Sequence, residues 1–149
     1  MKLENHETIE QKLTKYHEFF AVEHDFSINI RPIDPHHGIS YEQFIANMPT
    51  PFKMASDMST IDQSALRSIK ALSGVASQLV DFLNYQSTKI DLLIGYILSQ
   101  QDEEQHSYQG LKFGGGGLLF TASKAFDISK ILEMKIFLLN ENQAVYCYG

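Results

Sequence analysis

The sequence predicts an α+β fold in which one long helix assembles with other copies of the chain. Two observations lead to this expectation. Residues 65–97 keep an uninterrupted apolar heptad spacing, and the last third of the chain alternates short apolar runs with glycines and turn residues. A length of 149 residues suits one globular domain that carries an assembly element.

Composition excludes several classes of partner. The net charge is −6, and Arg31 and Arg67 are the two arginines, so the clustered cations that bind duplex nucleic acid or an anionic membrane are missing. No basic stretch followed by an apolar run resembles a signal peptide, and the longest apolar run, residues 92–98, is far shorter than the roughly 20 residues of a membrane span. With Cys147 as its single cysteine, the chain is expected to be cytoplasmic and reduced.

The first third is expected to hold a helix, a strand and a second, short helix. Residues 5–20 place apolar side chains at helical spacing, and residues 26–33 alternate with a period of two before the turn at 34–38. Ser40 and Gln43 form a capping box that begins the short helix. The apolar face of the first helix is predicted to be Ile9, Leu13, Tyr16 and Phe20, and Pro32 is expected near the end of the strand or on an edge.

The long helix is expected to begin near Thr60, with Gln63 as its capping partner, and to run to about Gln100. At 1.5 Å per residue, this helix would be about 60 Å long. Gly95 should weaken it locally by about 1 kcal/mol relative to alanine. The charge run at 102–104 is predicted to be a solvated region that ends the helix, since anions oppose the dipole there.

The heptad predicts self-association. The predicted seam consists of Ala65, Ile69, Leu72, Ala76, Leu79, Leu83, Gln86, Ile90, Leu93 and Ile97. The flanking positions are also apolar where a simple dimer would carry charges, which favours three or four helices, or a dimer that packs on its own domain as well. Gln86 is either a buried amide that sets register or an exposed, frayed position. The alternative for the whole stripe is an ordinary amphipathic helix packed on one core.

The last third is expected to form antiparallel strands. Residues 108–113 and 118–121 bracket four glycines, residues 131–139 form a long apolar run, and a turn at 140–142 leads to a strand from Val145. The few strands would leave bare edges, which suggests that the chain stops inside a domain or that the sheet is completed elsewhere.

The sequence does not predict an active site, a metal or a cofactor. Phosphate loops need a helix directly after the glycines, whereas a strand follows Gly117, so a tight turn is the better interpretation. The pair His36 and His37 lacks further ligands at metal spacing, and Cys147 among tyrosines is more typical of a buried small residue than of a nucleophile. The expectation is a protein that is not an enzyme.

From about Tyr108 to Gly149 the chain resembles the PilZ family of bacterial cyclic di-GMP receptors. The residues that carry the resemblance are Gly117-Leu118-Leu119-Phe120, Phe126, the run Ile131–Leu139 and Val145-Tyr146-Cys147-Tyr148-Gly149. The resemblance implies a small antiparallel β-barrel, of which this chain would hold a part. It also implies a binding motif, Asp/Asn-x-Ser-x-x-Gly, preceded by Arg-x-x-x-Arg.

The chain departs from that motif. If Gly117 is the glycine of the motif, Lys112 stands at the Asp/Asn position and Gly114 at the Ser position, and two distant arginines cannot form Arg-x-x-x-Arg. Arginine forks are what clamp the phosphates and guanines of a dianionic dinucleotide. Lys112, Gly114 and Gly117 are therefore a degenerate motif, and no nucleotide-binding residue is carried over.

The closest resemblance is to a tetrameric PilZ-like subgroup that assembles through heptad helices and lacks the arginine motif. The expected division is residues 1–56 as an N-terminal segment packing on the barrel, 57–104 as the coiled-coil-like helix and 105–149 as PilZ-like strands. The expected function is an oligomeric adaptor, from dimer to tetramer, that binds another protein in cyclic di-GMP-linked signalling. The alternatives are a cyclic di-GMP receptor with an atypical site, in which Lys112 and the glycine backbone bind the anion, and a scaffold unrelated to nucleotides.

Overall fold

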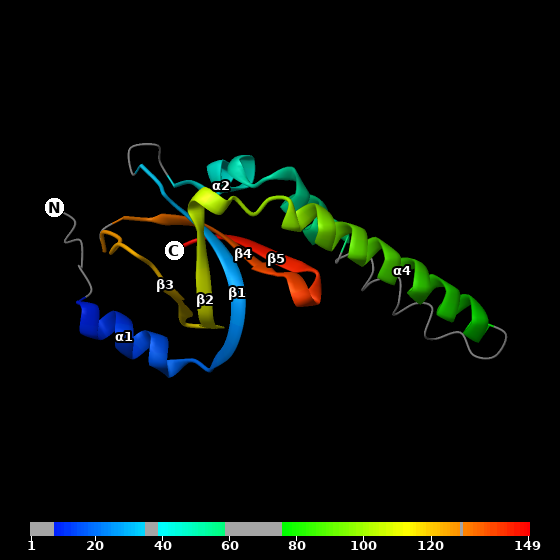
Figure 1. The fold of residues 1–149 in the computed structure, drawn as a ribbon, viewed down its shortest axis with the longest axis horizontal. Coiled ribbons are helices and arrows are strands. Elements are labelled where there is room, and N and C mark those ends of the chain that lie inside the picture. Colours follow the sequence, from blue (N-terminus) through cyan, green and yellow to red (C-terminus); the bar gives the residue numbers. More distant parts are fainter. Residues whose placement is uncertain (1–7, 35–38, 59–75, 129) are drawn as a thin grey trace.

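The structure is a computed structural model that describes residues 8–34, 39–58, 76–128 and 130–149. In this part of the chain, helices lie against a curled antiparallel sheet, and helix α4 extends away from it (Figure 1). The elements are α1 (Ile9–Glu18), β1 (Ala21–Pro32), α2 (Tyr41–Asn47), a helical segment at 50–58, α4 (Ala76–Ser99), the 3-10 turn η2 (Glu104–His106), β2 (Ser107–Gly114), β3 (Gly117–Thr121), β4 (Leu132–Leu138), the 3-10 turn η3 (Leu139–Glu141) and β5 (Gln143–Tyr148).

The sheet is open. Its strand order is β3-β2-β1-β4-β5, and every neighbouring pair is antiparallel. The α+β class is confirmed, but the described residues do not form a closed barrel, because closure would require β3 and β5 to pair and each has one hydrogen-bonded neighbour. Strand β1, from the N-terminal segment, lies in the middle of the sheet.

The two faces of the sheet carry separate cores. Along β1, Phe26, Ile28 and Ile30 point to one face, while Ser27, Asn29 and Arg31 point to the other, as the alternation of a strand requires. The first core consists of Phe26, Ile28, Ile30, Met134 and Ile136. The second core lies between the other face and the helices, and consists of Phe52, Leu98, Phe137 and Tyr146.

The predicted helices differ from the observed ones mainly at their ends. The capping box of Ser40 and Gln43 is present at the start of α2, as predicted, and a second one, between Thr8 and Gln11, begins α1. Phe20 was predicted on the face of the first helix, but it lies beyond the end of α1 and is 84% exposed. Helix α4 ends at Ser99, next to the predicted end. The predicted turn at 34–38 falls largely outside the described residues, as does the predicted helix start at Thr60.

The predicted strands of the last third are confirmed, with ends that differ by two residues at most. The first strand is longer than predicted, because β1 begins at Ala21 rather than near residue 26. Its pairing with β2 is shifted between Glu23 and Phe26, and this irregularity interrupts the sequence alternation that a strand prediction depends on. Pro32 is the last residue of β1, as expected.

Candidate functional site

Helix α4 packs on its own domain through a stripe that differs from the predicted seam. Leu98 is 1% exposed and belongs to the second core, and Ile94 packs against that core from one turn earlier. Gly95 is buried against the connection between β4 and β5. These contacts come from the C-terminal half of α4, whereas its N-terminal half extends beyond the sheet (Figure 1).

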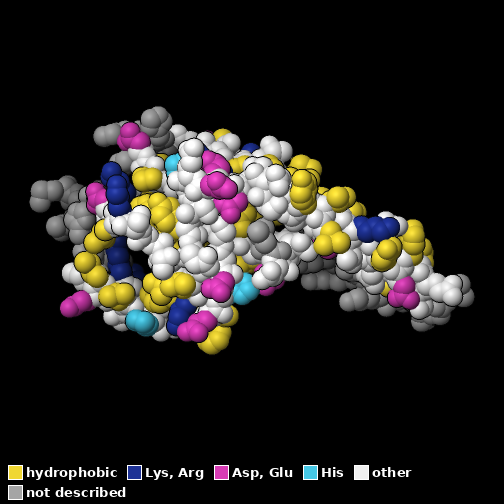
Figure 2. Space-filling view, viewed as in Figure 1, with side chains coloured by type: hydrophobic (Ala, Val, Ile, Leu, Met, Phe, Trp, Pro, Cys, Tyr) yellow, Lys and Arg dark blue, Asp and Glu magenta, His cyan; other side chains and the backbone are white. Residues whose placement is uncertain are grey.

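The described apolar residues of the seam are exposed to solvent. Leu79, Leu83, Ile90, Leu93 and Ile97 are between 38% and 64% exposed. At 3.6 residues per turn they lie on one side of α4, roughly a quarter turn away from Leu98. Figure 2 shows hydrophobic side chains along the part of α4 that extends from the domain. Ala65, Ile69 and Leu72 lie outside the described residues, and of Ala76 the helical backbone is described.

Residues beside the seam widen this apolar surface. Phe82 and Tyr96 are more than half exposed, and Gln86, the polar position of the heptad, is half-buried. Elsewhere on the exposed surface of α4, the Lys89 ammonium lies 4.5 Å from the centre of the Tyr85 ring, a cation–π contact. An amphipathic helix normally turns its polar face to water, so this apolar surface is unusual for a helix that acts alone.

The four glycines form a tight hairpin turn, as predicted. Gly114 ends β2, Gly117 begins β3, and the two pair across a two-residue turn. Gly117 has a φ of +145°, a backbone conformation in which any residue with a side chain would be strained. The glycines also let α1 approach closely, since a Cβ at Gly116 would lie 3.0 Å from the backbone oxygens of Lys15 and Tyr16.

The surroundings of this turn do not suit an anion. The turn faces the C-terminal end of α1, where carbonyl oxygens carry partial negative charge. The Lys112 ammonium lies 2.7 Å from the Glu23 carboxylate across the β1–β2 pair. This hydrogen bond lowers the pKa of Glu23 and raises the pKa of Lys112. The degenerate motif therefore consists of two glycines and a lysine that is already paired with a carboxylate. It lies next to a helix end whose partial negative charge would repel a phosphate.

The prediction of a solvated charge run after the long helix was wrong for Asp102 and Glu103. Asp102 accepts hydrogen bonds of 2.6 Å from Ser27 and from the buried Asn29. The Glu103 backbone N–H donates to the Asn29 side chain over 2.7 Å. We call these contacts, together with those of the Glu103 carboxylate described next, the clasp.

The Glu103 carboxylate completes the clasp with two cations. It accepts a hydrogen bond of 2.9 Å from Lys135 and also pairs with Arg31. The Lys135 hydrogen bond is the main reason why the pKa of Glu103 is lowered. The clasp ties the end of α4 to the polar side of β1 and β4. Sequence reasoning missed it because its hydrogen-bonded partners are separated by up to 75 residues, although the polar alternation of Ser27, Asn29 and Arg31 within a strand was a usable signal.

The other residues that the sequence analysis weighed for chemistry do not gather into a site in the described part of the chain. Burial raises the pKa of the Cys147 thiol, so the reactive thiolate is disfavoured. Among the described residues, no three His, Cys, Asp or Glu side chains gather closely enough to hold a metal ion. None of the described helices combines the length and hydropathy needed to span a bilayer. His36 and His37 lie outside the described residues.

Comparison of the chain with protein-family models, curated proteins and solved structures found no match.

Proposed function

We propose that this chain is a non-enzymatic adaptor that self-associates through α4 and displays several copies of its α+β domain. The observation that carries the proposal is the separation of two apolar stripes on one helix. One stripe, which includes Ile94 and Leu98, packs on the chain's own domain, while the heptad stripe that includes Leu83 and Leu93 stays exposed. The described residues of the heptad stripe belong to neither core of the domain, and burial against other copies would account for their apolar character.

The free energies of burial and association favour a broad interface between helices. Burying a Leu or Ile fully gains about 1.5–3 kcal/mol, so each half-exposed seam residue would gain roughly 1 kcal/mol. Two helices that met through the five described apolar positions would gain about 10 kcal/mol, which is comparable to the approximately 4–15 kcal/mol that association costs. The flanking Phe82 and Tyr96 would add to this gain if they were also covered. Assembly of more than two helices covers them, in agreement with the wide apolar face.

The experiment is to replace Leu79 and Leu83 with Asp together and to measure the mass in solution by sedimentation or light scattering. Two unpaired carboxylates buried per helix would be costly, so the wild-type protein should be an oligomer and the variant a monomer with an unchanged far-ultraviolet circular dichroism spectrum. The matched control is Met54→Asp, which changes an exposed apolar residue away from the seam. A monomeric wild-type protein, or a double variant that keeps the native mass, contradicts the proposal.

The link to cyclic di-GMP signalling is the second part of the proposal, and it depends on the PilZ-like pattern of residues 117–149. The competing receptor function would need Lys112 to bind a phosphate, but this ammonium is already paired with Glu23. Calorimetric titration with cyclic di-GMP separates the two functions. The adaptor should give no binding heat in the micromolar range, whereas micromolar binding that Lys112→Gln abolishes would establish the receptor instead.

A further inference from the structure

A pocket lies on the side of the domain where α4 meets β5 and the helical segment 50–58. Its volume is about 700 Å³, which is within the range of small-molecule sites. Of the seam residues that the structure describes, from Leu79 to Ile97, none lines the pocket.

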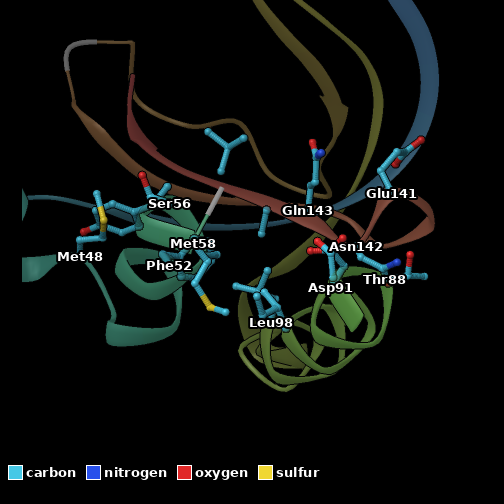
Figure 3. A pocket seen from close by; sticks show the side chains of 16 residues that line it. Met48, Phe52, Ser56, Met58, Thr88, Asp91, Leu98, Glu141, Asn142 and Gln143 are labelled. Atoms are coloured by element: carbon cyan, nitrogen blue, oxygen red, sulfur yellow. The ribbon is translucent and has the colours of Figure 1, made fainter. Parts of the chain in front are cut away.

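The pocket has an apolar floor. Phe52, Leu98 and Tyr146 contribute to it, and these side chains belong to the second core. Met48 and Met58 line the same region from the helical side, and thioether side chains adapt readily to different ligand shapes. Figure 3 shows Met48, Phe52 and Met58 together at one end of the pocket. An occupant would therefore need an apolar body.

The opposite end of the pocket is polar and acidic. Figure 3 places Asp91 beside Asn142 and Thr88 there. Among the lining residues that the structure describes, Asp91 and Glu141 are charged and none is a lysine or arginine. Glu141 is 3.6 Å from His24, whereas Asp91 has no hydrogen bond or ion pair with any residue that the structure describes. A cationic group on the occupant could form an ion pair with the Asp91 carboxylate.

We propose that this pocket binds a small organic cation with an apolar body, of which an alkylammonium ion is the simplest example. The apolar part would lie over Phe52 and Leu98, and the ammonium would approach the Asp91 carboxylate. Charge sets the preference among ligands of equal apolar size, because an anion at the same place would meet two carboxylates. The proposal therefore predicts that binding follows the order alkylammonium, neutral alcohol, carboxylate.

The test uses three probes of one chain length, octylammonium, 1-octanol and octanoate, with the intact protein. Methyl-labelled methionine reports on location, since Met48 and Met58 line the pocket while Met134 lies in the first core on the opposite face of the sheet. We expect octylammonium to shift the Met48 and Met58 methyl resonances and to leave Met134 unchanged. Shifts of Met134 alone, or no shifts with any probe, would overturn the proposal.

Two variants separate charge from shape. Asp91→Asn should weaken octylammonium binding by up to about fivefold, the size expected for a partly exposed ion pair, and should leave 1-octanol unaffected. The matched control is Asp81→Asn, which changes an aspartate of α4 outside the pocket. Thr88→Trp should block all three probes, because it fills the pocket from an exposed position on its wall. Equal affinity for octylammonium and octanoate in the wild-type protein would refute the charge assignment.

Discussion

Gly95 of α4 lies directly against Asn142 of the β4–β5 connection, and a Cβ at position 95 would be 2.8 Å from the Cβ of Asn142 and 2.9 Å from its Cγ. Asn142 has a φ of +53°, a left-handed conformation that asparagine tolerates better than most residues. The two residues together let a strand connection and a helix pack closely. The glycine that looks like a weakness in the helix is therefore the contact point that places α4 on the domain.

Gly95→Ala should destabilise the protein despite improving helix propensity. The gain in propensity is about 1 kcal/mol, whereas overpacking of a close contact costs about 1–3 kcal/mol. In an Asn142→Gly background the opposing side chain is absent and the left-handed φ is easier, so the same Gly95→Ala change should become stabilising. Urea unfolding of the four proteins measures this double-mutant cycle. Equal effects in both backgrounds would show that the two residues are not coupled.

Leu98 and Leu93 should behave oppositely, although both are leucines of α4. Leu98→Ala removes a fully buried side chain and should lower the free energy of unfolding by about 2–5 kcal/mol. Leu93→Ala changes a side chain that is 64% exposed and should leave the unfolding of the dissociated chain within about 0.5 kcal/mol. It should instead raise the dissociation constant of the oligomer. Denaturant unfolding and concentration-dependent sedimentation measure the two effects, and a large loss of chain stability in Leu93→Ala would place the seam inside its own domain.

The clasp should make stability depend on acidic pH. Because Lys135 and Arg31 hold the pKa of Glu103 below its ordinary value of 4.5, the unfolded chain takes up this proton at a higher pH than the native chain does. The stabilisation is therefore complete above about 4.5 and is lost as the pH falls through the lowered native pKa. Glu103→Gln should flatten the pH dependence of the melting temperature in this window. Glu104→Gln, which leaves the clasp intact, should retain the wild-type slope. An identical slope in Glu103→Gln would mean that other carboxylates set the pH dependence.

Gly114 and Gly115 should differ in their tolerance of alanine. A Cβ at Gly114 would lie 2.9 Å from the Ala21 Cα and 3.1 Å from the Phe20 carbonyl carbon, and backbone atoms of a paired strand cannot easily move. At Gly115 the nearest atom belongs to the exposed Phe19 ring, which can rotate. Gly114→Ala should cost about 1–3 kcal/mol and Gly115→Ala less than about 0.5 kcal/mol. Thermal unfolding of the two variants decides between this steric role and a turn in which the glycines are interchangeable.

Local signals in the sequence identified most of the secondary structure but little of the long-range chemistry. The capping box at Ser40 and the strand runs after residue 107 were readable because their determinants lie within a few residues of one another. The clasp could not be predicted in this way, because Asp102 is more than 70 residues away in the sequence from its partners Ser27 and Asn29. The pocket could not be predicted either, since its lining comes from three stretches that are far apart in the sequence, 48–58, 87–98 and 141–146.

The sequence by itself determined where the main helix and strands form and which side of α4 carries the heptad, because periodicity and capping are properties of neighbouring residues. The tertiary structure alone decided which side of that helix the domain uses. Apolar residues occupy several sides of α4, so their pattern could not distinguish packing on its own domain from packing on another copy. The domain packs on the side of α4 that carries Gly95 and Leu98, because Gly95 fits closely against the β4–β5 connection and Leu98 fills the second core. This close packing depends on residues that are distant in the sequence.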